Sequence, residues 1–351
     1  MKKYQVGIIG CGRIAYKHFD ALKKINNVEI KAVCDIKPDR AKKYAEQFQI
    51  PFYLDYRKML SNEDLDVVSV LTPSGTHPGI AIDVMNSGRN VIVEKPMALL
   101  LQDADRMIEC ADKNGVKLFV VKQNRFNLAV QKARVALQND RFGKLVLGTV
   151  RVRWCRNQAY YDQDDWRGTW AMDGGVLANQ ASHHIDLLQW FMGPVESVMA
   201  ITTCALVKIE TEDTAVAILR FVNGALGIIE ATTATRPKDI EGSLSLLGEK
   251  GTVEIGGFAV NKIKIWNFIE ETKVDENIRK DFSENPPNVY GNGHEPYLRQ
   301  VFESLDSGRT SLVEGLEGRK SIEIINALYE SAVTGKQVFI HNQFKNSPLG
   351  R

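Results

Sequence analysis

The stretch YQVGIIGCGRIA (residues 4–15) decides the fold of the first third of the chain. Its apolar first half predicts a buried strand that ends at Gly10, and the amphipathic stretch after Gly12 predicts a helix. Gly10, Gly12 and Ala15 have the spacing G-x-G-x-x-A. Because this spacing falls at the junction of a strand and a helix, it predicts the first turn of a dinucleotide-binding βαβ unit.

The residues of this turn each have a physical role in holding a dinucleotide. Gly10 permits the tight turn, Gly12 lets the backbone approach a pyrophosphate, and the helix start offers unpaired N–H groups to the anion. Asp35 ends the next predicted strand, where its carboxylate can accept both ribose hydroxyls and would repel a 2′-phosphate. The predicted cofactor is therefore NAD, although Lys37 nearby leaves NADP open.

The rest of the first third repeats this alternation of apolar runs and amphipathic stretches. Further strands are expected at 29–35, 66–73, 90–96 and 117–123, and helices at 38–48, 78–87 and 101–114. Strands that are apolar throughout and are each followed by a helix predict a parallel sheet covered on both faces. The expected fold class is α/β, with a doubly wound Rossmann domain over residues 1–121.

The pattern changes in residues 122–351, which we expect to form a second domain of α+β type. Helices are expected at 127–139, 174–191, 294–306 and 313–334, and strands at 144–154, 197–206, 213–222, 225–234, 242–248, 251–257 and 261–268. Asn223-Gly224 and the segment 248–251 are hairpin signals. These strands and hairpin signals predict a large, open and mostly antiparallel sheet. The polar tail, residues 341–351, is expected to be poorly ordered.

Composition excludes several classes of protein. Lys and Arg number 45 and Asp and Glu 43, a formal net charge of +2, so there is no electrostatic case for a nucleic-acid or membrane-surface partner. The five cysteines show no C-x-x-C pair, which favours a reducing, cytoplasmic setting. No apolar run approaches the roughly 20 residues that span a bilayer, and the N-terminus does not resemble a signal peptide.

The stretch NQASHHID (residues 179–186) holds two of the six histidines. On the expected helix, Asn179 and His183 are four apart and share a face, His184 points about a quarter-turn away, and Asp186 lies near His183. A metal site is disfavoured because adjacent histidines on a helix diverge. A buried histidine without a chemical role remains the alternative to a catalytic His183.

Glu94-Lys95-Pro96 follows the strand expected at 90–96, at the carboxyl edge where such sheets bind ligands. Pro96 restricts Lys95 to extended conformations. Lys95 is either a surface charge or a chemical group, and its place at the sheet edge favours the second interpretation.

Together, GIIGCGRIA with Asp35, the EKP segment, and GG-x-x-x-N-x-x-x-H-x-x-D over residues 174–186 resemble the Gfo/Idh/MocA oxidoreductase family. The resemblance covers nearly the whole chain. It implies that Lys95 and His183 flank the reacting sugar hydroxyl. The family usually has Asp where this chain has Asn179, and an amide cannot stabilise an imidazolium as a carboxylate does.

Four segments are similar to one subgroup, the UDP-N-acetylglucosaminuronate 3-dehydrogenases: NQASH, VVKQNR (120–125), YYDQDDWRGTW (160–170) and LLGEKGTVEIGG (246–257). This implies NAD-dependent oxidation of the sugar 3-hydroxyl to a ketone, an early step toward diacetamido-mannuronic acid for bacterial surface polysaccharide. The alternatives are a sugar or cyclitol dehydrogenase of the inositol type, or a cofactor-binding regulator without turnover. Because Lys95 and His183 are both present, the regulator is less favoured.

The resemblance also implies roles for individual residues. The general base is His183, with Lys95 as the alternative, and Asn179 holds the substrate or the imidazole. Cofactor contacts are expected from Gly10, Gly12, Arg13, Ile14, Asp35, Thr72, Pro73, His77, Glu94, Lys95, Gln123, Trp166 and Arg167. Substrate contacts are expected from Lys95, Asn124, Arg125, Arg153, Tyr160, Tyr161, Asn179, His183, Arg236 and Lys238, with Lys122 and Arg156 as further cations. No metal is expected, and the C-terminal sheet is expected to form a homo-oligomer, a dimer or a tetramer.

Overall fold

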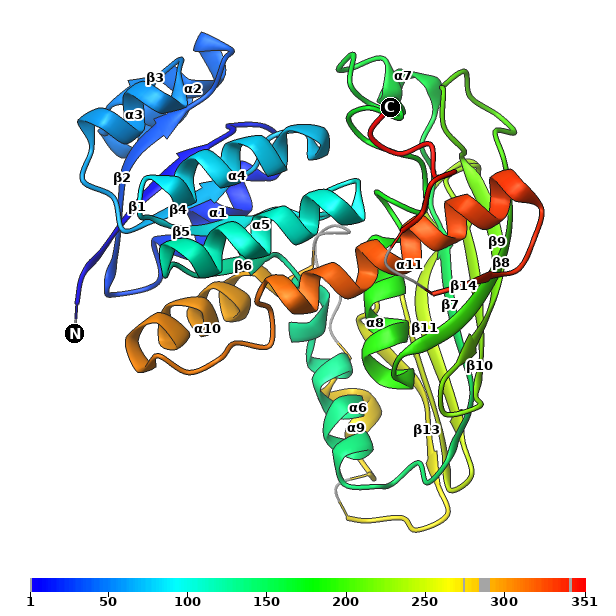
Figure 1. Ribbon diagram of the computed structural model, residues 1–351. Coiled ribbons are helices and arrows are strands. Elements are labelled where there is room, and N and C mark those ends of the chain that lie inside the picture. The colour runs from blue at the N-terminus through cyan, green and yellow to red at the C-terminus, as the bar shows by residue number, and fades with distance from the viewer. Residues whose placement is uncertain (1, 274, 284–290, 341–342) are drawn as a thin grey trace. The chain divides into compact units, whose positions relative to one another are not determined.

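The computed structural model describes the chain except residues 1, 274, 284–290 and 341–342. It divides into two compact units (Figure 1). The first comprises residues 1–122 and 294–319, and the second comprises 123–293 and 320–351. Residues 294–319 thus belong to the same unit as residues 1–122. The division expected from the sequence, with a single boundary after residue 121, places them in the second domain.

The first unit contains a six-stranded parallel sheet in the order β3-β2-β1-β4-β5-β6. The strands are β1 (Tyr4–Ile9), β2 (Val28–Cys34), β3 (Phe52–Tyr53), β4 (Val67–Val70), β5 (Asn90–Val93) and β6 (Leu118–Val120). This order is that of a Rossmann fold, so the predicted doubly wound domain is confirmed. The two-residue strand β3 was not predicted, because two residues are too few to form a pattern.

The helices of the first unit are α1 (Ala15–Leu22), α2 (Pro38–Phe48), α3 (Tyr56–Asn62), η1 (Ser74–Thr76), α4 (His77–Asn86), α5 (Leu101–Asn114) and α10 (His294–Ser307). Helices α4 and α5 pack together, as do α1 and α10. The second pairing explains why α10 belongs to this unit. Lys24 forms an ion pair with Glu295 at 2.8 Å, and the Tyr4 and Phe302 rings lie 5.3 Å apart.

The second unit contains an eight-stranded sheet in the order β13-β12-β11-β7-β10-β9-β8-β14. The strands are β7 (Leu145–Arg153), β8 (Val195–Thr203), β9 (Thr214–Phe221), β10 (Leu226–Thr232), β11 (Glu241–Gly248), β12 (Gly251–Gly256), β13 (Lys262–Phe268) and β14 (Val338–Phe339). Neighbouring strands are antiparallel except β7 and β10, which are parallel. The predicted antiparallel sheet is confirmed, with the short β14 added at its edge.

The second unit also contains helices (Figure 1). They are η2 (Gln123–Phe126), α6 (Leu128–Gln138), α7 (Gln158–Tyr161), α8 (Ser182–Met192), α9 (Ile278–Asp281) and α11 (Gly315–Thr334), of which α11 begins in the first unit. Helix α8 packs on β7 and β11. It approaches so closely that a Cβ at Gly148 would lie 2.7 Å from the Leu188 side chain. Strand β9 alternates buried and exposed residues, as a sheet covered on one face requires.

The helix predicted over 174–191 is wrong in its first half, because α8 begins only at Ser182. Gly174 has φ +73°, which interrupts a right-handed helix. The backbone then turns against a distant segment, with the Val176 N–H donating to the Glu212 carbonyl at 3.1 Å. Asn179 therefore precedes the helix that carries His183, and the two do not share a helical face.

The prediction of a poorly ordered tail over 341–351 falls outside the described residues at 341–342 and is wrong for the last residues of the chain. Leu349 is 1% exposed and lies close to Gly174. The Gly350 N–H donates to the Trp170 carbonyl at 2.8 Å. A polar composition concealed the one apolar side chain that fixes this end in the core of the second unit.

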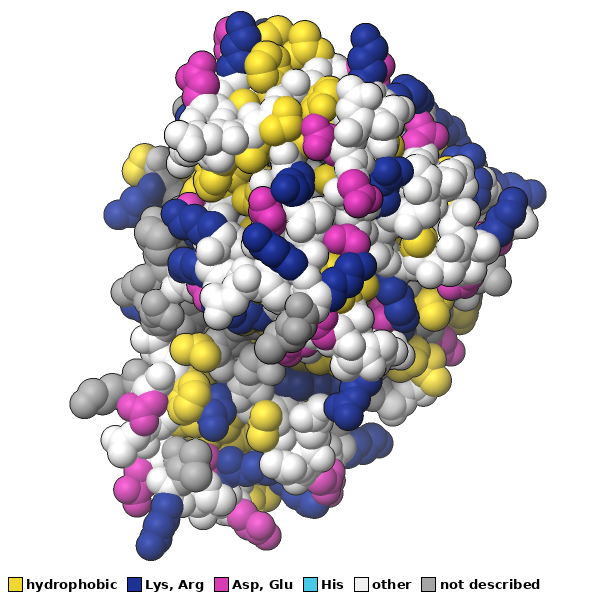
Figure 2. Space-filling model, turned by 90° about the vertical axis from the view of Figure 1, so that its left-hand side faces the viewer, with side chains coloured by type: hydrophobic (Ala, Val, Ile, Leu, Met, Phe, Trp, Pro, Cys, Tyr) yellow, Lys and Arg dark blue, Asp and Glu magenta, His cyan; other side chains and the backbone are white. Residues whose placement is uncertain are grey.

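The molecular surface carries mixed charge. On the face drawn in Figure 2, Lys and Arg side chains alternate with Asp and Glu, and neither sign forms a continuous patch. This distribution agrees with the net charge of +2. Among the helices that the structure describes, none has both the length and the apolar character needed to cross a bilayer.

Candidate active site

The glycine turn between β1 and α1 has the geometry that a dinucleotide needs. Gly10 has φ +98°, and a Cβ there would lie 2.7 Å from the Leu71 carbonyl carbon, so only glycine fits. A Cβ at Gly12, by contrast, would meet nothing within 4 Å. The turn thus presents open backbone at Gly12, where a pyrophosphate can approach. Arg13 and Ile14 follow in the same turn, and the Arg13 side chain is exposed.

Asp35 follows β2, and its carboxylate is held by backbone donors. The Cys11 N–H donates to Oδ2 and the Lys37 N–H donates to Oδ1, each at 2.8 Å. A carboxylate oxygen has two lone pairs, so each oxygen keeps one for a further donor. Asp35 is therefore oriented by the protein and still able to accept a pair of neighbouring ribose hydroxyls.

Lys95 comes directly after a buried carboxylate at the carboxyl end of β5. Glu94 is 6% exposed; its Oε1 lies 3.0 Å from Nε2 of His18, and its Oε2 accepts the Lys95 N–H at 3.0 Å. Burial is the largest single effect and raises the pKa of Glu94, but the hydrogen bond from His18 and the electrostatic effects of its neighbours together outweigh it and lower the pKa to about 2. Glu94 thus fixes the backbone at Lys95, and its expected contact with the cofactor stays a prediction.

Two further histidines support the same segment. Nε2 of His294 lies 3.9 Å from Oε1 of Glu94, and burial lowers the pKa of His294 to about 3, so its ring is neutral. One ligand atom from each of His18, Glu94 and His294 lies within 4.8 Å of the others, a spacing that could suit a metal ion. Because the carboxylate already engages Nε2 of His18, we interpret the cluster as a hydrogen-bonded support for Lys95.

His77 links two loops of the first unit. Its ring nitrogens lie 2.8 Å from the Pro96 carbonyl and 2.8 Å from the Thr72 carbonyl. Burial lowers the pKa of His77, although both carbonyls oppose this shift. His77 was expected to contact the cofactor, but it is 1% exposed and connects the end of β4 to the Lys95 segment. Thr72 and Pro73, beside it, are half-buried.

His183 lies in the first turn of α8, in the second unit. Its side chain is 6% exposed, and its Nε2 lies 2.8 Å from Nε2 of Gln123. Gln123 begins η2 and was expected to contact the cofactor. That contact stays a prediction, while the structure brings together Gln123 and His183, two residues 60 positions apart in the chain.

Arg125 and Asp186 form a buried ion pair between η2 and α8. Nε and Nη2 of Arg125 donate to the two carboxylate oxygens of Asp186 at 2.8 and 2.9 Å. Arg125 is 1% exposed. Two of its donors are therefore engaged by Asp186, and the expected contact of Arg125 with an anionic substrate stays a prediction. Asn124 beside it is also buried.

Asn179 is oriented by a carboxylate that the sequence analysis missed. Its Nδ2 donates to Oδ1 of Asp173 at 2.6 Å, while Oδ2 of Asp173 accepts the Gly168 N–H at 2.8 Å. The amide nitrogen of Asn179 therefore faces Asp173. The position of Asp173 directly before Gly174-Gly175 was the available signal, because the turn that follows brings Asn179 back to it.

Glu212 supports the same turn from behind and was also missed. Its Oε1 accepts the Leu177 N–H at 3.0 Å and the Tyr329 hydroxyl at 2.7 Å. Burial raises the pKa of Glu212 to about 7, and Asp173 adds to this effect. Nothing in the local sequence connects Glu212 with residues 35 positions earlier, because the contact depends on the fold of the sheet.

The aromatic segment around α7 is tied together by one arginine. The Arg167 guanidinium lies 4.8 Å from the Tyr160 ring centre and 4.5 Å from that of Trp166, and it donates to the Tyr160 hydroxyl at 2.9 Å. The Tyr161 hydroxyl lies 3.1 Å from Oγ1 of Thr233 and is buried. Tyr161 thus packs against the sheet, whereas Tyr160, Trp166 and Arg167 form a partly exposed aromatic cluster, in which the Arg167 side chain is 7% exposed.

The remaining basic residues differ in how far the protein neutralises them. Arg153 pairs with Glu230 at 2.6 Å, and Arg156 pairs with Asp239 at 2.9 Å. Arg236 donates to backbone carbonyls, and its side chain is exposed, as is that of Lys238. Arg236 and Lys238 are therefore exposed cations, as expected of residues that bind an anion.

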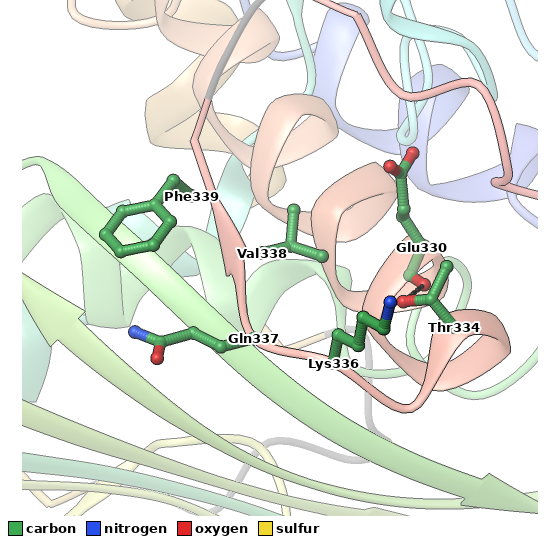
Figure 3. A pocket seen from close by; sticks show the side chains of 6 residues that line it. All are labelled: Glu330, Thr334, Lys336, Gln337, Val338 and Phe339. Carbon is green, nitrogen blue, oxygen red and sulfur yellow. Dashed lines mark hydrogen bonds between the residues drawn. The ribbon is translucent and has the colours of Figure 1, made fainter.

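A separate pocket lies between the C-terminal half of α11 and β14 (Figure 3). Its lining residues are Glu330, Thr334, Lys336, Gln337, Val338 and Phe339. None of the candidate site residues is among them, so this pocket is distinct from the features described above.

Comparison with known proteins agrees with this geometry. Residues 4–122 match the model of the oxidoreductase family with an NAD-binding Rossmann fold, and residues 130–254 match the GFO/IDH/MocA C-terminal domain. The chain belongs to the Gfo/Idh/MocA oxidoreductase family. The resemblance in the motifs is thereby confirmed, and the open turn at Gly12 and the oriented carboxylate of Asp35 fit NAD as the cofactor.

Two solved structures are similar over nearly the whole chain. One is the WlbA dehydrogenase from Bordetella pertussis in complex with NADH and UDP-GlcNAcA (41% identity, TM-score 0.93, 97% of this chain and 98% of that one). The other is the WlbA dehydrogenase from Chromobacterium violaceum with the same ligands (42% identity, TM-score 0.92, 98% of each chain). A curated relative, myo-inositol 2-dehydrogenase from Thermotoga maritima, is 28% identical over 91% of this chain and 93% of its own length.

Proposed function

We propose that this chain oxidises the 3-hydroxyl of UDP-N-acetylglucosaminuronate (UDP-GlcNAcA) to a ketone with NAD. The observation that carries the proposal is the similarity, at 41–42% identity over 97–98% of the chain, to two dehydrogenases whose structures hold NADH and UDP-GlcNAcA. The residues that the motifs single out, Lys95, Asn179 and His183, are all present. The reaction would be an early, cytoplasmic step toward diacetamido-mannuronic acid for surface polysaccharide.

The cofactor would be held by the first unit. Gly12 would face the pyrophosphate, Asp35 would accept the ribose hydroxyls, and the negative charge of Asp35 would disfavour a 2′-phosphate. When bound, NAD supplies an acceptor for the hydride that leaves the sugar carbon. Trp166 and Arg167, in the partly exposed aromatic cluster, are proposed as further cofactor contacts.

The proton of the hydroxyl would leave on a side chain of this protein. As the C–H bond gives its electron pair to the cofactor, the O–H bond breaks and its proton passes to Nε2 of His183, which leaves a ketone. Lys95 would donate a hydrogen bond to the same oxygen and stabilise its developing negative charge. Asn179, oriented by Asp173, would hold the imidazole or the substrate.

The substrate carries a diphosphate and a carboxylate, so it requires cationic partners. Arg236 and Lys238 are proposed for this role because both are exposed. Arg153 could serve only by exchanging its pairing with Glu230, whereas Tyr160 and Asn124 offer hydrogen bonds. Tyr161, which is buried against the sheet, would support the sugar pocket from behind.

We also propose that the chain forms a homo-oligomer through the open face of the eight-stranded sheet. Met199, Ile218 and Ile228 lie side by side on β8, β9 and β10. Exposed apolar side chains on this face and its neighbouring strands are Val146, Met199, Ile201, Val216, Ile218, Leu226 and Ile228. A continuous apolar face of this kind marks an interface, and a second copy of the same face would cover it.

Light scattering and sedimentation would test this interface. Ile218→Lys should shift the chain toward the monomer, because a charge would then lie at the centre of the apolar face. Ile269→Lys, at an exposed apolar residue outside the sheet face, is the matched control. An unchanged mass for Ile218→Lys would reject the interface.

The substrate would be tested by cofactor reduction, followed by absorbance, with UDP-GlcNAcA, UDP-N-acetylglucosamine and inositol in parallel. Alcohol oxidation by NAD is unfavourable near neutral pH, so the assay would include an aminotransferase with glutamate, or 2-oxoglutarate, to remove a product. Turnover with the uronate alone would support the proposal. Turnover with inositol would favour the activity of the 28% identical relative instead.

A further inference from the structure

The orientation of the Gln123 amide against His183 determines which imidazole nitrogen can lack a proton. Nε2 of Gln123 lies 2.8 Å from Nε2 of His183, and the two side chains are 3% and 6% exposed. An amide nitrogen carries two hydrogens and no lone pair, so it can only donate. The ring nitrogen that faces it must accept, and the proton of the neutral ring therefore resides on Nδ1.

The position of Gln123 is fixed by its neighbours in η2. Two residues later, Arg125 grips both carboxylate oxygens of Asp186, which lies on α8 three residues after His183. The Arg125 guanidinium also lies 5.0 Å from the Trp190 ring centre on the same helix. Because both oxygens of Asp186 are bonded, this buried ion pair fixes the position of η2 relative to α8. It thereby places the Gln123 amide against the His183 imidazole.

A second constraint acts on the backbone of Gln123. A Cβ at Gly293 would lie 2.1 Å from the Gln123 carbonyl oxygen. The backbone at Gly293 therefore approaches the backbone of Gln123 so closely that only glycine fits there. The side chain is confined as well, since Oε1 of Gln123 is buried and has no hydrogen-bond partner among the residues that the structure describes. A buried acceptor without a hydrogen bond destabilises the folded chain, so its retention calls for a functional explanation.

We propose that Gln123 is a positioning residue that keeps Nε2 of His183 unprotonated and occupies the place that the substrate hydroxyl takes on binding. Nε2 has a single lone pair, so the Gln123 amide and a hydroxyl cannot both use it. The hydroxyl displaces the amide, gives its proton to Nε2, and becomes the ketone oxygen as hydride leaves the carbon. This role rests on the proposed function and identifies the chemical nitrogen within it.

The orientation of Asn179 agrees with this assignment. Asp173 takes the Asn179 amide N–H, which turns the carbonyl oxygen of Asn179 away from Asp173. A carbonyl oxygen can accept Nδ1–H, the proton that the Gln123 contact requires.

The other charged groups of these elements are already engaged. Arg125 and Asp186 pair with each other, and Asp173 accepts from Gly168 and Asn179. Replacing the Gln123 amide by a carboxylate of the same shape therefore isolates one change. A carboxylate can only accept, so Nε2 would have to gain a proton to keep the contact.

The first test is nitrogen NMR of the full chain labelled with ¹⁵N in the histidine rings, without ligand at neutral pH. His183→Asn identifies the His183 signals by their loss. We expect a protonated Nδ1 and an unprotonated Nε2 for His183. A proton on Nε2 would overturn the proposal, and this measurement needs neither turnover nor a variant of Gln123.

The second test is Gln123→Glu, with Gln337→Glu as the matched control far from the histidine in the sequence. The Gln337 amide donates to Ser197 at 2.8 Å, so the control also replaces a bonded amide by a charge. In Gln123→Glu the titration midpoint of His183 should rise by about 1–3 pH units, the shift that an adjacent carboxylate causes. The acid limb of kcat/KM should move equally, whereas the control should change neither.

The two proposals fail in different ways. If the tautomer and the Gln123→Glu shift are observed but UDP-GlcNAcA is not oxidised, the substrate is wrong and the role of Gln123 toward His183 stands. An unchanged His183 midpoint in a folded Gln123→Glu protein would overturn the role of Gln123, whatever the substrate.

Discussion

Two glycine turns precede the two helices that carry the candidate site, and they use glycine for opposite reasons. Before α1, a Cβ at Gly12 would meet nothing within 4 Å, so the missing side chain leaves room for a ligand. Before α8, a Cβ at Gly175 would lie 2.0 Å from Oε2 of Glu212, so the missing side chain makes room for the protein itself. A glycine in a motif thus leaves room for a ligand in one unit, at Gly12, and permits close packing within the protein in the other, at Gly175.

The buried carboxylates of the two units differ in the same way. Glu94 accepts from His18 and lies beside Lys95, and these partners overcome burial and lower its pKa to about 2. For Glu212 burial is the larger effect, since its partners are the neutral Tyr329 hydroxyl and a backbone N–H, and its pKa rises to about 7. A buried carboxylate keeps its charge at neutral pH only where a cationic or strongly donating partner is built in.

The largest expected effect separates the chemical groups of the two units. His183→Asn should lower the turnover number with UDP-GlcNAcA by about 10²–10⁴-fold, the usual contribution of a general base. Initial rates at saturating substrate would measure it, with NAD affinity as the control because the cofactor residues are unchanged. If His183→Asn kept most of its turnover while Lys95→Met lost it, Lys95 would be the base.

The contrast between the carboxylates predicts a pH-dependent stability. Because the pKa of Glu212 is about 7 in the folded chain and 4.5 ordinarily, the folded state binds more protons between these values. This contribution to stability is complete below about pH 4.5 and is lost as the pH rises to about 7. Glu212→Gln cannot ionise, so between these pH values it should gain up to about 3 kcal/mol over the parent chain.

Urea unfolding of both proteins at pH 4.5, 6 and 7.5 would measure this difference. The Gln side chain keeps an acceptor oxygen for Tyr329 and Leu177, so the comparison isolates the charge. Unfolding free energies that differ by the same amount at all three pH values would show that Glu212 ionises normally in the folded chain.

The two glycines give a matched pair of substitutions. Gly175→Ala should destabilise the fold by about 1–3 kcal/mol, because the new methyl group overpacks against Glu212. The melting temperature should then fall by several degrees, at about 2–4 °C for each kcal/mol of lost stability. Gly12→Ala should leave the melting temperature of the cofactor-free chain unchanged and weaken NAD binding. If both variants melted alike and bound NAD alike, the distinction between open and filled turns would be refuted.

The sequence predicts the elements well where a pattern is local. Apolar runs followed by amphipathic helices predict the parallel sheet of the first unit. Consecutive strands without helices between them, joined by hairpin signals, predict the antiparallel sheet of the second. The two-residue strands β3 and β14 escape notice because backbone pairing alone defines them. The late start of α8 escapes because Glu212, a distant residue, satisfies the N–H groups of Val176 and Leu177.

Candidate site residues follow the same division. Gly12, Asp35 and His183 could be proposed from motifs, since each stands at a fixed offset from a strand or a turn. The contact of Gln123 with His183 could not, because it forms only when η2 packs against α8, whereas the contact of Asp173 with Asn179 depends on the turn at Gly174. Charge alone does not identify a ligand contact, as Arg125 illustrates: a cation expected to meet the substrate is buried and pairs with Asp186.

The smallest expected effect concerns cofactor choice in the first unit. Asp35→Asn removes the charge that opposes a 2′-phosphate but keeps the shape and one acceptor oxygen. At the roughly 1 kcal/mol that a pair of charges about 4 Å apart contributes in water, the ratio of NADP to NAD affinity should rise at least about fivefold. Titration calorimetry with both nucleotides would measure the ratio, and Asp39→Asn, in the first turn of α2, controls for the loss of a negative charge nearby. If Asp39→Asn raised the ratio equally, the preference would reflect the general field of this surface, and the carboxylate of Asp35 would serve mainly to hold the turn through the N–H groups of Cys11 and Lys37.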